Sequence, residues 1–161
     1  MYVLGGYDGS IFQGDILRTT DGQHFATVGT LPVPVRYAAI AVDGSTIYLF
    51  GGDRQNGPTD VVQAFDTKSG KARVVAHLPV ALGHATALNL GGRLLVAGGR
   101  TTRRATRQIW SFDPVDLRFI AVGKLPLAMS DAGAAVVGSV GYLVGGEADS
   151  ALSRVVALRL A

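Results

Sequence analysis

The sequence predicts an all-β fold built from repeated four-stranded sheets, and three observations support this prediction. Strand-like apolar runs that end in a glycine pair recur along the whole chain. Leu-Pro pairs recur with the same period. No segment keeps a helical apolar stripe free of glycine and proline, which argues against repeats made of paired helices. The chain of 161 residues is long enough for one ordinary domain.

The period of the repeat is close to 47 residues. The glycine pairs lie 46, 47 and 47 residues apart, at Gly5-Gly6, Gly51-Gly52, Gly98-Gly99 and Gly145-Gly146. Leu-Pro pairs begin at Leu31, Leu78 and Leu125, and Phe-Asp pairs begin at Phe65 and Phe112, again 47 residues apart. Three markers with one period predict a repeat protein. The repeat units of this single domain are expected at about 1–34, 35–81, 82–128 and 129–161.

The second unit illustrates the four strands of each repeat. Its strands are expected at about 36–42, 46–50, 61–65 and 72–78. The second strand is apolar on both alternations (TIYLF here, RLLVA and VGYLV in later units), as expected of a strand buried between neighbouring sheets. The glycine pair that follows it suits a positive φ or the close approach of a neighbouring backbone. All eight paired glycines are therefore predicted to be structural.

These residues resemble the kelch repeat family of β-propellers. The matching features are the apolar run closed by Gly-Gly, an aromatic-Asp pair 14 residues after it, and Leu-Pro at the end of the outer strand. The family usually has Trp seven residues past the third-strand aromatic, where this sequence has Phe25, Ala72 and Phe119. The second unit is therefore expected to pack less tightly. Trp110 is expected in the core, and the segment TTDGQHF is expected to form a structural turn.

The resemblance covers the whole chain and implies a kelch-type β-propeller that is only partly present. The first unit begins in its second strand and the last ends after its third, which gives about three and a half blades. Kelch propellers commonly close with about six or seven blades. We therefore expect either missing upstream blades, which we favour, or assembly of several copies to close the ring.

Composition excludes several classes of function. The chain has no cysteine, which excludes disulfides, thiolate zinc sites and cysteine nucleophiles. No His, Asp and Glu cluster has the spacing of metal ligands, and no cofactor is predicted. The net charge of +3 favours an acidic partner without requiring nucleic acid. The apolar runs are strand-sized, and no signal peptide is recognised, so the compartment stays open. An export signal or membrane anchor could lie in a longer parent chain.

One candidate site lies at the start of the first strand of each unit. In kelch propellers the loops that meet on one face usually bind ligands, and Tyr37, His84 and Asp131 lie 47 residues apart there. Arg36 precedes Tyr37. Tyrosine, histidine and carboxylate groups could supply acid–base chemistry or hydrogen bonds to a sugar. The alternative is a set of ordinary polar residues at a solvated channel mouth, because the three positions lie on different blades.

A second candidate surface is formed by the loops between the second and third strands. Its candidate residues are Tyr7, Asp8, Asp53, Arg54, Arg100, Arg103, Arg104, Arg107 and Glu147. The segment RTTRRATR concentrates positive charge and could bind phosphate, carboxylate or an anionic glycan, or could be a solvated loop. Nucleic acid is not expected, because no stacking aromatics lie between the arginines.

The expected function is a binding or scaffold module for a protein or glycan ligand, without a self-contained catalytic site. The alternative is a carbohydrate-processing enzyme similar to the kelch-type sialic acid mutarotases, for which Arg36 and Asp131 are the available charged pair. A third interpretation is a purely structural fragment. Copper oxidases of the galactose-oxidase type resemble this fold, but their tyrosine–cysteine crosslink requires a cysteine, which this sequence lacks.

Overall fold

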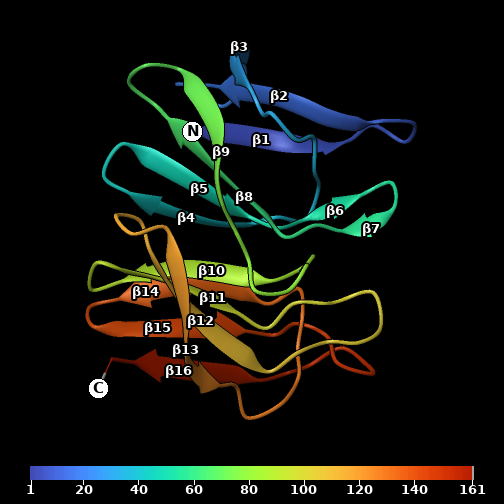
Figure 1. Ribbon diagram of the computed structural model, residues 1–161, viewed down its shortest axis with the longest axis vertical. Helices are drawn as coiled ribbons and strands as arrows, with labels where there is room; N and C mark the ends of the chain where they lie inside the picture. Colours follow the sequence, from blue (N-terminus) through green and yellow to red (C-terminus); the bar gives the residue numbers. More distant parts are fainter. Residues whose placement is uncertain (161) are drawn as a thin grey trace.

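The computed structural model describes residues 1–160 and consists of antiparallel sheets stacked along the long axis of the molecule (Figure 1). Each main sheet is a meander in which strands adjacent in sequence are adjacent in space. The first sheet contains β1 (Tyr2–Tyr7), β2 (Phe12–Arg18) and β3 (Ala26–Thr30). The second contains β4 (Ala39–Asp43), β5 (Thr46–Phe50), β8 (Val61–Asp66) and β9 (Lys71–His77). The prediction of an all-β fold with repeated sheets is confirmed.

The third sheet contains β10 (Thr86–Leu90), β11 (Arg93–Ala97), β12 (Gln108–Asp113) and β13 (Arg118–Lys124). The fourth contains β14 (Gly133–Val137), β15 (Val140–Val144) and β16 (Val155–Arg159). The sheets do not close into a ring within residues 1–160, so the structure is part of a propeller. In the same residues the structure contains no helix, and hence none that could cross a membrane.

The second sheet differs from its predicted strands in two places. Its first strand begins at Ala39 instead of 36, because Tyr37 adopts a φ of 55° that interrupts extended backbone. The polar loop expected after Gly52 contains a two-stranded hairpin of β6 (Asp53–Arg54) and β7 (Gly57–Pro58). The segment DRQNGPT contains the turn dipeptide Asn-Gly but has no apolar alternation beside it, so a loop was expected there instead of a hairpin.

The hydrophobic core consists of three clusters, each between two neighbouring sheets. In the cluster between the second and third sheets, Phe50 and Phe112 pack edge to face with ring centroids 5.4 Å apart. Phe119 packs on Phe112 at 4.7 Å. Trp110, which was expected in the core, is only partly buried and packs against this cluster from its side. Apolar contact between sheets therefore holds the stack together.

The glycine pairs lie where one sheet meets the next. All eight glycines have positive φ. A Cβ atom on Gly51 would collide with the backbone carbonyl of Leu82, in the connection that leads into the third sheet, and the Gly52 N–H donates to that same carbonyl at 2.8 Å. The Gly99 N–H makes the equivalent bond to Met129 at 2.8 Å. Absence of a side chain here allows the backbones of adjacent sheets to touch.

The innermost strands β4, β10 and β14 lie side by side and bring equivalent residues of three sheets together. The residues just before these strands are Tyr37, His84 and Asp131, with φ values of 55°, 58° and 57°. The His84 N–H donates to the Tyr37 carbonyl, and the Asp131 N–H donates to the His84 carbonyl, both at 2.9 Å. A continuous backbone ladder therefore fixes the depth of these three side chains.

Candidate functional site

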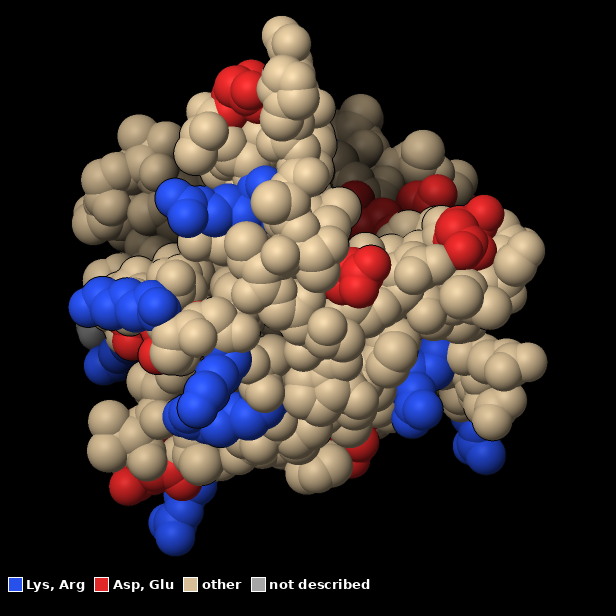
Figure 2. Space-filling model, turned by 90° about the horizontal axis from the view of Figure 1, so that it is seen from above, with Lys and Arg blue, Asp and Glu red and all other residues tan. Residues whose placement is uncertain are grey.

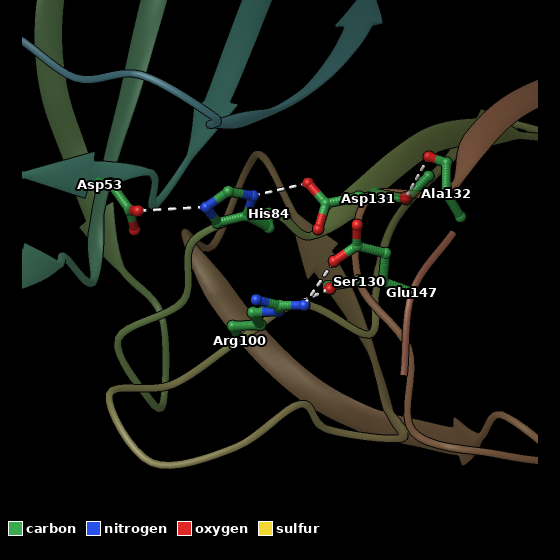
Figure 3. Close-up of polar contacts among 8 residues, drawn as sticks. Asp53, His84, Arg100, Ser130, Asp131, Ala132 and Glu147 are labelled. Atoms are coloured by element: carbon green, nitrogen blue, oxygen red, sulfur yellow. Dashed lines mark hydrogen bonds and ion pairs between the residues drawn. The ribbon is translucent and has the colours of Figure 1, made fainter. Parts of the chain in front are cut away.

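His84 lies at the centre of a polar cluster formed by three sheets (Figure 3). Its Nδ1 is 2.6 Å from Oδ1 of Asp131, and its Nε2 is 3.1 Å from Oδ2 of Asp53. An ionised carboxylate only accepts hydrogen bonds, so both contacts are satisfied together when the imidazole carries two protons. The His84 side chain is 20% exposed, which leaves the cluster accessible from solvent. His84 is thus poised between two acceptors that could also bind donors of a ligand.

The position of Asp53 depends on a glycine. Gly83 precedes His84, and a Cβ atom at Gly83 would collide with the Asp53 carboxylate. The equivalent positions in the neighbouring sheets are occupied by Arg36 and Ser130. The missing side chain at Gly83 therefore gives the carboxylate the space from which it reaches His84.

Arg36 and Tyr37 extend the cluster on the side of the first sheet. The Tyr37 ring stacks on the His84 ring with centroids 4.2 Å apart and planes 26° apart. The Arg36 guanidinium lies 5.0 Å from the Tyr37 ring centre, 4.8 Å from that of Tyr7 and 5.4 Å from that of Phe12. Attraction between a cation and aromatic rings stabilises this placement.

The result is a row of four side chains, Arg36, Tyr37, His84 and Asp131, which we call the polar row. The structure brings all four predicted channel-mouth residues together, although Arg36 and Asp131 are separated by the two rings. The buried Nε of Arg36 has no hydrogen-bond partner within residues 1–160. The row therefore presents a cation at one end, a carboxylate at the other and an aromatic face between them.

The arginine segment divides into residues with different roles. Arg100 Nη2 donates to Glu147 at 2.7 Å, and Arg100 Nε donates to Ser130 Oγ at 2.8 Å (Figure 3). Arg107 Nε donates to the Leu125 carbonyl at 2.7 Å. These bonds connect the loop to the third and fourth sheets. The side chains of Arg103 and Arg104 are exposed, beside a hollow of about 760 Å³ lined by the 100–105 loop, Leu127, Ala128, Ala148 and Asp149.

The remaining loop candidates lie around the first sheet. The Tyr7 hydroxyl donates to the Gly9 carbonyl at 2.8 Å. The Asp8 carboxylate accepts the N–H groups of Ile11 and Ser10, which lower its pKa. Asp8 therefore stabilises its own loop. Arg54 lines a hollow of about 430 Å³ together with Tyr7 and Phe12, close to the Arg36 end of the polar row.

Sequence reasoning placed Asp53 on the loop face and did not connect it with His84. It also gave no role to Gly83 or Ser130. A signal was present, because Tyr7, Asp53, Arg100 and Glu147 each directly follow a glycine pair. In the structure three of them form backbone bridges to the residues that precede Tyr37, His84 and Asp131, namely Asp53 with Arg36, Arg100 with Gly83 and Glu147 with Ser130. Asp53, Arg100 and Glu147 of the second candidate surface therefore lie next to the first candidate site.

Most of the face seen in Figure 2 is uncharged, with basic and acidic side chains scattered over it in small groups. In residues 1–160 no group of three or more His, Cys, Asp or Glu side chains is arranged to hold a metal ion. The polar row offers hydrogen bonding and aromatic stacking to a ligand.

Comparison with known proteins identifies the repeat. The sequence matches the model of the KLHDC2/KLHL20/DRC7 Kelch-repeats domain over residues 1–161. The fold is similar to the solved structure of YjhT, with a TM-score of 0.82 and 18% identity over 92% of this chain and 50% of that chain. The chain thus spans about half the length of YjhT, and at this identity the likeness concerns the fold alone. No curated protein matches the sequence. The chain belongs to the kelch-repeat family of β-propellers.

Proposed function

We propose that this chain is a binding module that holds a protein or glycan ligand at the polar row and Asp53. Membership in the kelch-repeat family supports a binding role, because propeller loops vary on a rigid frame. The observation that carries the proposal is the row itself, in which side chains from separate sheets stack and hydrogen-bond at one depth.

The backbone conformation at Tyr37, His84 and Asp131 disfavours side chains, so the residue type at each position bears on function. Tyr37, His84 and Asp131 all adopt left-handed φ values, where glycine is the least strained residue. A side chain there costs about 1–2 kcal/mol per residue. The chain nevertheless carries an aromatic, an imidazole and a carboxylate at the three positions. A role for these side chains outside the backbone ladder accounts for that choice.

The chemistry of the row fits a ligand that has both polar and apolar faces. Tyr37 is 53% exposed, so its ring and hydroxyl can contact a ligand directly. Asp53 and Asp131 would accept hydrogen bonds from sugar hydroxyls or peptide amides, and Arg36 would donate to carbonyl or carboxylate oxygens. Consecutive units of a glycan or a peptide chain carry such hydroxyl, amide or carbonyl groups, so one ligand could contact several neighbouring side chains of the polar row.

The experiment compares two double variants in a glycan array and in a titration against a partner obtained by pull-down. H84A/D131A removes the centre and one end of the row, and R103S/R104S changes two exposed arginines outside it. We expect H84A/D131A to weaken binding by about tenfold or more, while R103S/R104S binds like the parent at high salt. Thermal melts of both variants establish that each is folded. Equal binding by folded H84A/D131A and the parent would exclude the polar row as the site.

A second candidate function is the carbohydrate-processing one, and the contacts of His84 favour it. Mutarotation of a sugar requires one group to take the proton of the anomeric hydroxyl and another to protonate the ring oxygen. The His84 imidazole lies within hydrogen-bond distance of the Asp53 and Asp131 carboxylates. These groups could take the proton from the sugar and return it to the ring oxygen. Exchange between sugar anomers, followed by NMR for the parent and for H84Q, tests this function. A parent rate equal to that of buffer alone would rule it out.

A further inference from the structure

His84 contacts two carboxylates that come from different parts of the fold (Figure 3). Asp131 lies just before β14, and Asp53 begins the hairpin of β6 and β7. The distance from His84 Nδ1 to Asp131 Oδ1 is 2.6 Å, and that from Nε2 to Asp53 Oδ2 is 3.1 Å. A neutral imidazole carries one N–H, so it can donate to only one of two ionised carboxylates. One of the two contacts must therefore be lost when His84 is neutral.

Asp131 is the partner that a neutral His84 would keep. Its contact is the shorter one, and the Asp131 N–H also donates to the His84 carbonyl at 2.9 Å. The imidazole itself is held by the Tyr37 ring, which stacks on it with centroids 4.2 Å apart. With the remaining proton on Nδ1, Nε2 presents a lone pair to the Asp53 carboxylate, and two acceptors at this distance repel each other. Asp53 is therefore the group that moves.

The backbone of Asp53 is fixed, so its movement is confined to the side chain. The Asp53 N–H donates to the Arg36 carbonyl at 2.7 Å, and the Asp53 carbonyl accepts the Arg36 N–H at 3.1 Å. Within residues 1–160 the Asp53 carboxylate makes its one hydrogen bond with His84. The side chain is 22% exposed. A change of its χ1 rotamer would therefore take the carboxylate to solvent and leave the hairpin in place.

Gly83 provides the space that the bound carboxylate occupies. The three atoms nearest to a Cβ atom placed at Gly83 all belong to the Asp53 carboxyl group. Gly83 does not have a positive φ, so alanine would not strain its backbone. G83A should therefore displace the Asp53 side chain from His84 while the surrounding backbone stays as it is.

The other charged groups around His84 have different partners. The Arg36 guanidinium lies on the far side of the stacked ring, 5.0 Å from the Tyr37 ring centre. Arg100, on the loop that follows β11, donates to Glu147 at 2.7 Å (Figure 3). The two carboxylates that flank His84 therefore have the imidazolium as their nearest cation. Loss of its charge leaves them to repel each other, which adds to the repulsion between acceptors.

We propose that His84 is a proton-dependent latch for the Asp53 carboxylate. The protonated imidazole holds Asp53 at Nε2, and loss of the Nε2 proton to solvent water releases the carboxylate while Nδ1 stays bonded to Asp131. Histidine side chains ordinarily change protonation between about pH 5 and 8, so the latch opens across this range. A released Asp53 could accept hydrogen bonds from a ligand, and this consequence rests on the function proposed above.

The latch is tested by NMR on the protein alone, between about pH 5 and 8. The three-bond couplings between Hα and Hβ report the χ1 rotamer of each aspartate, and the ring nitrogen shifts report the protonation of His84. We expect the Asp53 couplings to move from those of one rotamer toward averaged values as His84 loses its proton. The Asp131 couplings should stay constant, although Asp131 senses the same change in charge.

Three variants locate the movement, and thermal melts establish that each is folded. In G83A the Asp53 couplings should be averaged at every pH, because the added Cβ atom keeps the carboxylate away from His84. In H84Q they should no longer change between pH 5 and 8. G123A is the matched control, because Gly123 also lacks a positive φ and a Cβ atom there has its nearest neighbour at 3.8 Å. Its Asp53 couplings should follow pH as in the parent.

Two results would overturn the proposal. The first is a set of Asp53 couplings that stays constant while His84 titrates in the parent protein. The second is a pH dependence of the Asp53 couplings in folded G83A equal to that of the parent, because the rotamer would then change without the contact at His84. Neither measurement involves a ligand, so failure of the latch is distinguishable from failure of the proposed ligand site.

Discussion

The middle sheets and the terminal sheets of this molecule are made from similar sequences but are buried to different extents. Ala97 at the end of β11 is 4% exposed, whereas Val144 at the same register position of β15 is 51% exposed. β11 and β15 are comparably apolar (RLLVA and VGYLV). The difference arises because a following sheet covers the third sheet, and none covers the fourth within residues 1–160. Burial here is a property of the position in the stack.

The glycine pairs show the same difference between the middle and the terminal sheets. A Cβ atom on Gly51 would collide with the Leu82 carbonyl in the connection to the next sheet. A Cβ atom on Gly145 would have its nearest neighbour, the Leu152 carbonyl of the same sheet, at 3.6 Å. Both residues have φ values near 65°, so they share the conformational constraint but only Gly51 has the steric one. Each contact between two neighbouring sheets therefore makes its own contribution to the free energy of unfolding, as in other repeat proteins.

The largest effect is expected from alanine at these two glycines. G51A should destabilise the protein by about 3 kcal/mol or more, because about 1–2 kcal/mol of left-handed strain adds to about 1–3 kcal/mol of overpacking. G145A should be destabilised only by the left-handed strain of about 1–2 kcal/mol, because a Cβ atom there meets no close neighbour. Urea denaturation of both variants measures the difference. Equal midpoints would mean that the junction does not require contact between backbones.

A valine pair tests the apolar part of the comparison. Val96 in β11 is 0% exposed, and V96A should cost about 2 kcal/mol through lost transfer energy and a residual cavity. V144A, the same change on the open face of the fourth sheet, should stay within about 0.5 kcal/mol. Thermal melting of the two variants under identical conditions provides the check. A large loss for V144A would indicate that something covers that face in solution.

The attachment of the first sheet to the second depends on a buried amide. Gln63 of β8 donates to the Val33 carbonyl and accepts the Val33 N–H, both at 2.9 Å. Q63L should cost about 1–2 kcal/mol, because both Val33 groups lose their partner. Hydrogen exchange should accelerate in β1–β3 more than in β10–β13. Uniform acceleration across all sheets would contradict this local role.

The equivalent residue in the third sheet provides the control. Trp110 occupies the position of Gln63 one period later, and its buried Nε1 has no hydrogen-bond partner within residues 1–160. W110F removes that unsatisfied donor together with part of the ring. The stability change should stay within about 1 kcal/mol, because relief of the donor offsets part of the lost contact.

The sequence predicted the fold through its period and predicted the polar row through its register. Tyr37, His84 and Asp131 were recognisable because they lie one period apart. Their mutual contact was not predictable, because it depends on how closely the sheets approach at the glycine pairs. The contact of Asp53 with His84 was missed for a similar reason. It requires the space at Gly83, which matters only once two sheets are brought together.

The arginine segment shows a different limit of sequence reasoning. Proximity in the sequence placed four arginines in one candidate group, namely Arg100, Arg103, Arg104 and Arg107. In the structure Arg100 is paired with Glu147 and Arg107 with a backbone carbonyl. The pairing of Arg100 follows from the register, since Glu147 also lies one period later. The bond from Arg107 to Leu125 depends on loop geometry that no periodic signal encodes.

The smallest effect is expected from the turn carboxylates of the first sheet. Bonds from the His24 side chain, the His24 N–H and the Gln23 N–H lower the pKa of Asp21 below its ordinary 3.8. Asp8 is shifted in the same direction by N–H groups of its own loop. A carboxyl with a lowered folded-state pKa stabilises the protein above its ordinary pKa, and this stabilisation is lost as pH falls toward the folded-state value. Stability should therefore decline below about pH 3.8, and both residues are exposed, so the decline should be shallow.

A double variant isolates the contribution of these carboxylates. D8N/D21N keeps an acceptor oxygen in each turn but removes the ionisable group. The melting temperature of the variant should fall less than that of the parent as pH decreases from about 6 to 3. D66N is the matched control in the second sheet, because hydrogen bonds from Lys68 and Ser69 also lower the pKa of Asp66. If the terminal sheet is the weaker end of the stack, the acceleration of hydrogen exchange in β1–β3 on lowering the pH should be smaller in D8N/D21N than in the parent, whereas D66N should leave it unchanged. Identical exchange in the two variants would mean that acid acts on the whole stack at once, and that the first sheet is held as firmly as the middle ones.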